Sequence, residues 1–178
     1  GLSLSRVLVT HHHADHAAGC SALKRETGCE VLGPSDSRVP ALDRSLGDGD
    51  RLGCGEGAAR TGGSALEIEA VHVPGHTKTH LAFEVRAGIE RFLFSGDCLF
   101  PAGCGRIVEG THGEMLCSLR RLAAREPAPF GGGKAPDGAA PRTALPSAVL
   151  LAGHEYTLEN LAFASSIEPR NPRPAARA

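Results

Sequence analysis

Residues 7–16 of the chain read VLVTHHHADH, a short apolar run that passes directly into a cluster of histidine and aspartate side chains. His11 and His13 are two positions apart, so on an extended segment their side chains leave the same face. Asp15 and His16 follow where the chain is expected to turn into a helix and can reach a neighbouring point. Imidazole and carboxylate groups at this spacing suit a borderline metal ion such as zinc or iron.

Three later apolar runs end in a similar way, with a glycine followed by one candidate ligand. The ligands are His76, Asp97 and His154, which follow the runs at residues 66–73, 92–94 and 149–151. Binding sites in open α/β proteins gather at strand ends, and a glycine lets the backbone approach a metal closely. One such residue alone is usually a structural group, and the histidine run alone could be a surface cluster or a tag remnant. The combination of four strand ends favours a metal site.

Seven candidate ligands are too many for one tetrahedral ion and suit two ions. They are His11, His13, Asp15, His16, His76, Asp97 and His154. Asp97 is the expected bridge, and Asp15 and Asp97 are assigned to catalysis as well as to metal binding. Two ions ~3.5–4 Å apart can share a hydroxide whose pKa falls to ~7 from ~15.7 in bulk water. Zinc is the expected metal, with iron and manganese left open.

The remaining histidines and one cysteine carry other expectations. His12 is expected to face away from the ligands, His72 to lie on a strand, and His112 to be solvated at the start of a helix. His80 is a candidate hydrogen-bond partner of the ligands, since metal ligands usually have such partners. Cys104 is expected to be a small packing residue rather than a nucleophile.

Short apolar runs alternate with helical patterns, which predicts an α/β fold. Besides the runs above, strands are expected at residues 7–9, 30–32 and 81–85, the last with one wet face that carries Ala82 and Glu84.

Three helices are predicted. The first follows Asp15, runs through Leu23 and ends at Gly28. The third begins near Thr157, presents Leu158, Leu161 and Ala162, and stops before Pro169. The second opens with a capping-box spacing and places four side chains on one face. The capping pair is Thr111 and Glu114, and the face carries Met115, Leu119, Leu122 and Ala123.

The length of 178 residues fits one domain, expected at residues 1–172 with a tail at 173–178. Residues 126–147 are rich in proline and glycine and read as a long inserted loop.

The formal net charge of −1 and the absence of tryptophan disfavour binding to nucleic acid or to an anionic membrane. No apolar run reaches the ~18 residues that a membrane span needs. The first residues do not resemble a signal peptide, and the six cysteines form no Cys-x-x-Cys pair. A cytoplasmic location is therefore expected, with an organelle left open.

The ligand pattern resembles that of the metallo-β-lactamase superfamily, and several finer motifs resemble glyoxalase II, the hydroxyacylglutathione hydrolases. These motifs are GHT at 75–77, GDCLF at 96–100, AGCGR at 102–106, EGT at 109–111 and GHEYT at 153–157. Thr79 departs from the pattern, because glycine is usual at that position in the family. The resemblance spans roughly residues 7–172.

That resemblance implies an αββα sandwich and hydrolysis of glutathione thioesters of the S-lactoylglutathione type by a metal-bridging hydroxide. It assigns one metal to three histidines, the other to Asp15, His16 and His154, and the bridge to Asp97; the three histidines are His11, His13 and His76. Arg106 and Tyr156 match positions that contact glutathione. The expected partner is this small-molecule substrate alone, with the chain a monomer.

By the same resemblance, the chain is expected to lack the family's first strands and its C-terminal helical domain. Two alternatives therefore stay open. One is a truncated chain that binds metal with little or no turnover. The other is a sulfur dioxygenase of the same superfamily, which uses a single iron.

Overall fold

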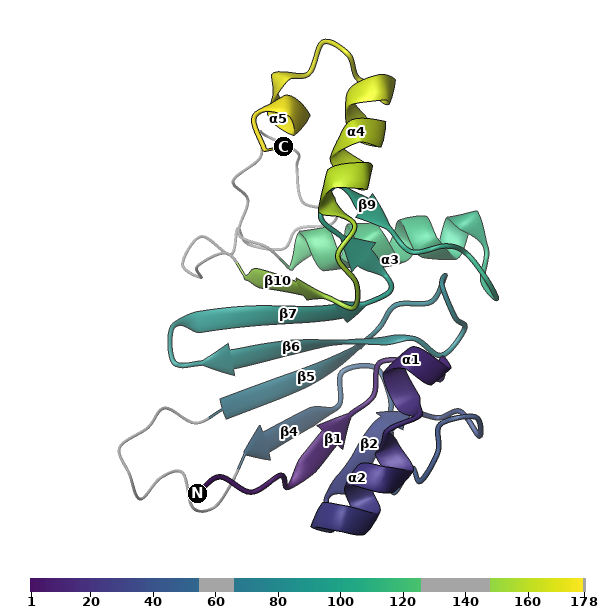
Figure 1. Cartoon of the computed structure of the whole chain (residues 1–178), viewed down its shortest axis with the longest axis vertical. Coiled ribbons are helices and arrows are strands. Elements are labelled where there is room, and N and C mark those ends of the chain that lie inside the picture. The colour runs from purple at the N-terminus through teal and green to yellow at the C-terminus, as the bar shows by residue number, and fades with distance from the viewer. Residues whose placement is uncertain (55–65, 126–147, 178) are drawn as a thin grey trace.

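The structure is a computed structural model that describes residues 1–54, 66–125 and 148–177 (Figure 1). The proline- and glycine-rich segment at 126–147 lies outside the described residues. The elements are β1 (Arg6–Leu8), α1 (Ala14–Ala17), α2 (Cys20–Thr27), β2 (Glu30–Pro34), β3 (Arg44–Leu46), β4 (Arg51–Cys54), β5 (Leu66–His72), β6 (Leu81–Ala87), β7 (Glu90–Gly96), β8 (Leu99–Phe100), β9 (Gly103–Cys104), α3 (His112–Ala124), β10 (Val149–Ala152), α4 (Thr157–Ile167) and α5 (Pro172–Ala175).

The strands form two main sheets and a small hairpin. The first sheet has the order β1-β2-β3 and is parallel, with Val7 opposite Val31. The second has the order β10-β7-β6-β5-β4, in which β4 to β7 are antiparallel and the edge strand β10 runs parallel to β7. All six strands predicted from apolar runs are confirmed, whereas β3, β4, β8 and β9 were not predicted.

Three clusters of buried side chains define four layers. Leu32 and Leu46 of the first sheet pack with Ile68 and Phe83 of the second, which forms the core between the sheets. The outer face of the first sheet is covered by α1 and α2, which lie at the opposite end of the molecule from α4 and α5 (Figure 1). The outer face of the second sheet packs against Met115 and other residues of α3. The predicted αββα sandwich is therefore confirmed.

The prediction of a wet face on β6 is wrong. Ala82 and Glu84 are buried, because α3 covers that face of the sheet. Glu84 accepts hydrogen bonds from three arginines, which compensate for the loss of its hydration. These donors are Arg86, Arg91 and Arg125.

The first predicted helix is divided. α1 ends at Ala17 and α2 begins at Cys20, with Gly19 as the N-cap of α2. Glycine disfavours a continuous helix because it costs more backbone entropy than other residues. The predicted end is confirmed, since Gly28 adopts the left-handed conformation at φ 71° and its N–H donates to the carbonyl of Lys24.

The capping box of Thr111 and Glu114 is present at the start of α3. Met115 and Leu122 are buried and Leu119 packs against them, but Ala123 is exposed, contrary to prediction.

α4 begins and ends as expected, and its Leu161 is buried. Its predicted apolar face is wrong at Leu158 and Ala162, which are exposed because only one side of the helix contacts the domain. Part of the expected tail is helical, since the side chain of Asn171 accepts from the N–H of Arg173 and caps α5.

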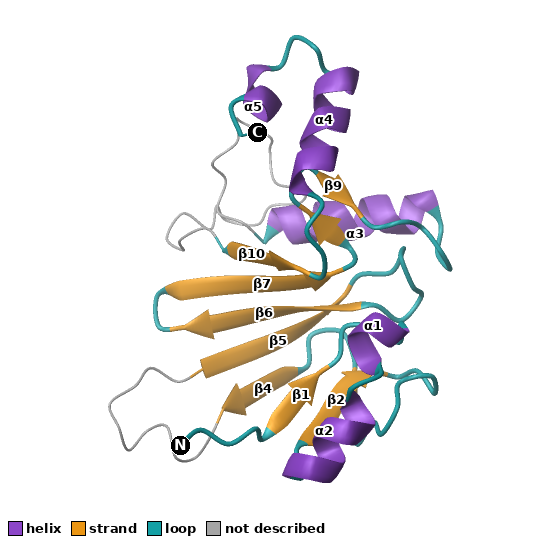
Figure 2. Ribbon diagram, viewed as in Figure 1, coloured by secondary structure: helices purple, strands orange, loops and turns teal. Residues whose placement is uncertain are grey.

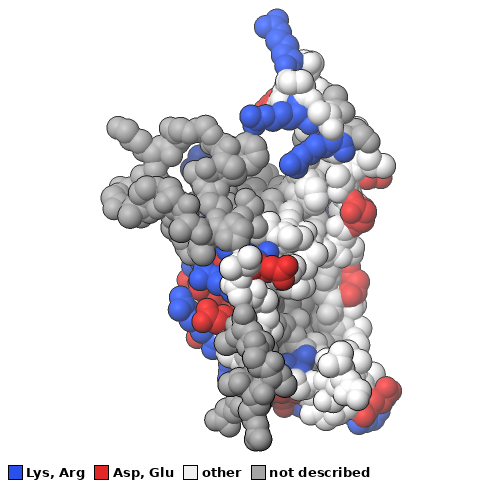
Figure 3. Space-filling view, turned by 90° about the vertical axis from the view of Figure 1, so that its left-hand side faces the viewer, with Lys and Arg blue, Asp and Glu red and all other residues white. Residues whose placement is uncertain are grey.

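The surface in Figure 3 carries intermixed acidic and basic side chains, and basic side chains gather at the end with α5. The described residues form no continuous basic surface on this face. Among the helices of the described ranges, none is long and apolar enough to cross a bilayer.

Candidate metal centre

Four strands deliver the candidate ligands to one side of the molecule. The carboxyl ends of β1, β5, β7 and β10 all lie on this side (Figure 2). His11 follows β1, His76 follows β5, Asp97 follows β7 and His154 follows β10, while Asp15 and His16 lie on α1. Their ligand atoms form three overlapping groups, in each of which all atoms lie within 4.8 Å of one another. The structure thus brings all seven predicted ligands together.

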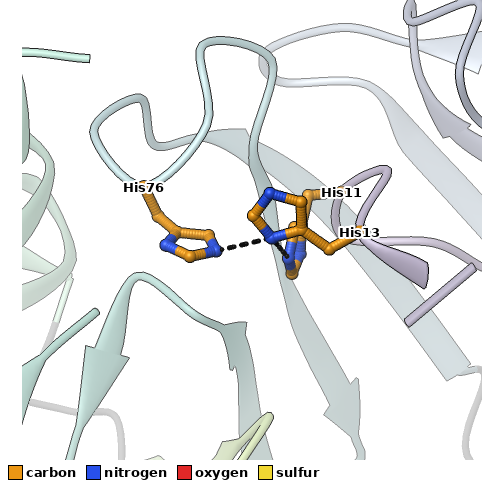
Figure 4. A group of neighbouring side chains, drawn as sticks. All are labelled: His11, His13 and His76. Carbon is orange, nitrogen blue, oxygen red and sulfur yellow. Dashed lines mark hydrogen bonds between the residues drawn. The ribbon is translucent and has the colours of Figure 1, made fainter. Parts of the chain in front are cut away.

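The first group contains His11, His13 and His76 (Figure 4). His13 Nδ1 lies 3.2 Å from His11 Nε2 and 3.0 Å from His76 Nε2. His76 Nδ1 donates to the carbonyl of Arg106 at 2.7 Å, so Nε2 of the neutral ring carries a lone pair. A single hydrogen on His13 Nδ1 cannot serve both neighbours, and at least one close contact therefore lacks a hydrogen bond. Converging imidazole lone pairs of this kind fit a metal cation.

The second group contains Asp15, His16 and His154. His154 Nε2 lies 3.2 Å from Asp15 Oδ2 and 3.2 Å from His16 Nε2. Two imidazoles and one carboxylate supply three ligands and leave room for a water molecule or a substrate atom, as catalytic zinc sites do.

Asp97 lies between these two groups and forms the third group with His11 and His16. Its Oδ1 is 3.3 Å from His16 Nε2, and its Oδ2 is 3.5 Å from Nε2 of both His76 and His154. Oδ1 is buried and has no hydrogen-bond partner among the described residues. Because a buried carboxylate oxygen without a partner is costly, this atom also fits a metal ligand.

Burial and neighbouring charges favour the protonation states that bind metal. Burial, together with His80 and His16, lowers the pKa of His11 to about 2, and burial also lowers the pKa of His13. Burial alone would raise the pKa of Asp97, but the neighbouring His16, whose Nε2 lies 3.3 Å from Oδ1, outweighs it and leaves the value at about 2. The same close contact with Asp97 raises the pKa of His16. Metal binding requires neutral imidazole and ionised carboxylate, so these shifts suit a metal at the first group and Asp97.

Two glycines allow the backbone to approach Asp97. A Cβ on Gly153 would lie 2.5 Å from Asp97 Oδ1 and 2.8 Å from His16 Cε1. A Cβ on Gly105 would lie 1.8 Å from the carbonyl oxygen of Asp97. No other residue fits either position without displacing Asp97.

Residues behind the ligands hold their orientation. His80 Nε2 accepts from the backbone N–H of Asp97 at 3.1 Å, and its ring stacks on His11 at 4.7 Å, as expected of a hydrogen-bond partner. Thr10 Oγ1 lies 3.0 Å from His11 Nδ1, a contact that was not predicted. In the sequence, only the position of Thr10 next to His11 could have indicated this contact. The hydrogen bond from His76 to the backbone carbonyl of Arg106 could not have been predicted from the sequence.

The two expected substrate contacts border this cluster. Tyr156 is half-exposed, and its ring stacks on His154 at 5.5 Å and meets Phe100 edge to face at 5.3 Å. Arg106 has an exposed side chain, and its carbonyl contacts His76 as described above.

The other histidines lie outside the three groups. His12 faces Asp36 and Glu109, His112 is exposed, and His72 at the end of β5 contacts the carbonyl of Lys78. Cys104 is exposed on β9, so its interpretation as a packing residue is wrong; its hairpin is too small to cover it.

The four layers, in the order α, β, β, α, place a histidine-rich cluster at the strand ends. This combination is that of a domain built around a candidate metal site. The chain belongs to the metallo-beta-lactamase superfamily, whose family model matches residues 1–155.

Two curated relatives are named hydroxyacylglutathione hydrolase. That of Chromohalobacter salexigens is 44% identical over 173 residues, which are 97% of this chain and 56% of the relative. That of Pseudomonas paraeruginosa is 43% identical over 169 residues, 94% of this chain and 54% of the relative. The chain spans about half the length of the curated relatives it matches.

Solved structures support the same fold. ETHE1 from Myxococcus xanthus superposes with a TM-score of 0.60 at 24% identity, over 87% of this chain and 56% of that one. At this identity the similarity concerns the fold alone.

Proposed function

We propose that this chain carries a dinuclear metal centre that hydrolyses glutathione thioesters of the S-lactoylglutathione type to a 2-hydroxy acid and glutathione. The position of Asp97 carries the proposal. Its carboxylate lies against both groups of ligands: Oδ1 is 3.3 Å from His16, and Oδ2 is 3.5 Å from both His76 and His154. A carboxylate so placed can bridge two ions, which a mononuclear site would not need.

The residues divide between the two ions by their contacts. His11, His13 and His76 would hold the first ion, and Asp15, His16 and His154 the second. Two divalent ions, most simply zinc, supply an activated water and a Lewis acid for the thioester carbonyl when bound. Asp97 would hold the two groups of ligands in position relative to each other. Its carboxylate is ionised, and its backbone N–H donates to His80.

Arg106 and Tyr156 are proposed to bind the glutathione moiety. The exposed guanidinium of Arg106 can pair with a substrate carboxylate, and its carbonyl holds His76. Tyr156 presents a half-exposed ring beside His154. The leaving thiolate has a pKa near ~8.5, so the site needs no strong general acid.

The names of the curated relatives support this substrate class. Two relatives named hydroxyacylglutathione hydrolase are 43–44% identical to the chain. A single-iron dioxygenase would need only one open group of ligands, whereas Asp15, His16 and His154 form a second group.

The test is hydrolysis by purified protein that has been loaded with zinc. We expect loss of the thioester absorbance of S-lactoylglutathione and release of free thiol in equal amounts. An Asp97→Ala variant should lose this activity together with at least one ion. Protein that binds two ions and leaves the thioester intact would refute the proposed reaction.

A further inference from the structure

A carboxylate–arginine–carboxylate bridge lies behind the first group of ligands. Arg38 donates from Nη2 to Asp36 Oδ2 at 2.7 Å, from Nε to Asp36 Oδ1 at 2.9 Å, and from Nη1 to Glu109 Oε1. Asp36 belongs to the loop after β2 and Glu109 to the segment before α3. One guanidinium therefore joins two segments that are 71 residues apart in the chain.

Both carboxylates of this bridge also hold the turn that carries His76. Asp36 Oδ2 accepts from Thr79 Oγ1 at 3.0 Å, and Glu109 Oε2 accepts from the backbone N–H of Lys78 at 3.0 Å. The N–H of Glu109 donates to the carbonyl of His76 at 3.2 Å. The side chain of Thr79 thereby joins the turn directly to the bridge.

The same two carboxylates face His12, which lies between two candidate ligands. His12 Nδ1 is 3.5 Å from Asp36 Oδ2, and His12 Nε2 is 3.6 Å from Glu109 Oε1. His12 separates His11 from His13 in the chain, so the bridge also lies against the segment that carries these two ligands.

Arg38 keeps this arrangement together. The side chains of Asp36 and Glu109 are only 5% and 19% exposed, and without the guanidinium they would repel each other across His12. Arg38 donates a hydrogen bond to each of the two carboxylates and so offsets this repulsion.

We propose that Arg38 is a positioning residue that fixes the His76 turn against the His11–His13 segment and so sets the metal affinity of the first group. The inference rests on the proposed metal centre but not on the identity of the substrate. Removal of residues that orient metal ligands typically weakens metal binding by ~10–100-fold.

The experiment measures zinc affinity by competition with a chromophoric chelator, together with thermal melts of the metal-free proteins. Arg38→Ala should weaken binding of one zinc ion by ~10–100-fold and leave the second unchanged. Arg38→Lys should give an intermediate loss, because lysine keeps the charge without the planar fork. Arg121→Ala is the matched control, since Arg121 is similarly exposed and joins Asp48 to the carbonyl of His72.

A purely structural role predicts a different result. In that case Arg38→Ala would lower the melting temperature of the metal-free protein and bind both zinc ions within twofold of the wild type, which would overturn the proposal. Equal weakening in Arg121→Ala would also overturn it. If Arg38→Ala does not fold, unchanged zinc affinity in Arg38→Lys is the contradicting result.

The two proposals fail in different ways. Wild-type protein that binds two zinc ions without hydrolysing the thioester refutes the reaction, while weakened zinc binding in the Arg38 variants still supports the positioning role. Wild-type protein that binds no zinc refutes both.

Discussion

Gly153 lies directly against Asp97, so close that a Cβ at position 153 would come within 2.5 Å of Asp97 Oδ1. The glycine directly follows β10 and allows His154 to reach the same carboxylate, at 3.5 Å from Oδ2. The turn after β10 therefore supplies the candidate ligand His154 and leaves space for Asp97, the proposed bridge.

Replacement of Gly153 by alanine should displace Asp97 and His16 and lower thioester hydrolysis by about a hundredfold, the usual cost of a 1 Å misplacement in an active site. Steady-state kinetics and metal content of Gly153→Ala test this. The control is Gly19→Ala, where a Cβ meets nothing within 4 Å. Equal activity in the two variants would contradict the close approach.

Loss of the buried carboxylate on β6 should destabilise the fold. Glu84 is 2% exposed and accepts from three arginines, so we expect Glu84→Gln to cost about 3–5 kcal/mol of unfolding free energy. Urea titration measures this cost. Glu90→Gln, at an exposed position on the neighbouring strand β7, should change stability by less than about 0.5 kcal/mol.

The contribution of Glu84 should disappear in acid. Burial alone would raise the pKa of Glu84, but hydrogen bonds from Arg125, Arg91 and Arg86 outweigh it and lower the value from 4.5 to about 2. Because the folded value is depressed, the stabilisation is complete above pH 4.5 and is lost as the pH falls towards 2. The difference in unfolding free energy between wild type and Glu84→Gln should shrink over this interval. A constant difference would contradict the assignment.

Metal removal should lower thermal stability, because His11, His13 and His76 direct lone pairs at one point. At a free zinc concentration a hundredfold above Kd, each ion contributes about 2.7 kcal/mol, or about 5–10 °C in Tm. Melts with zinc and with a chelator measure this. The increase in Tm on adding zinc should be smaller in His76→Ala than in the wild type. In His112→Ala it should equal that of the wild type, because the exposed His112 lies outside the three groups.

Local sequence patterns predict much of the fold but not contacts between distant residues. The runs at residues 66–73 and 92–94 are apolar enough to identify strands, whereas Leu46 is the single apolar residue among the three of β3. Glu84 was interpreted as solvent-facing because its partner Arg125 lies 41 residues away. Burial of a charge depends on such a partner, which a pattern along one strand does not contain.

The candidate ligands were predictable for a related reason. Each follows a strand, and a glycine precedes three of them, so the pattern is local even though the site is not. Asp36 and Arg38 were not identified, because an aspartate and an arginine two positions apart in a loop resemble an ordinary solvated turn. Their significance depends on Glu109 and the His76 turn, which only the folded chain brings to them.

The central claim is that Asp97 joins two metal sites in one chain. Elemental analysis of purified, zinc-loaded protein, with the same sample assayed on S-lactoylglutathione, tests it most directly. We predict two zinc ions per chain and hydrolysis of the thioester. A single ion per chain in protein that is fully loaded, with Asp97→Ala retaining that ion, would contradict the account.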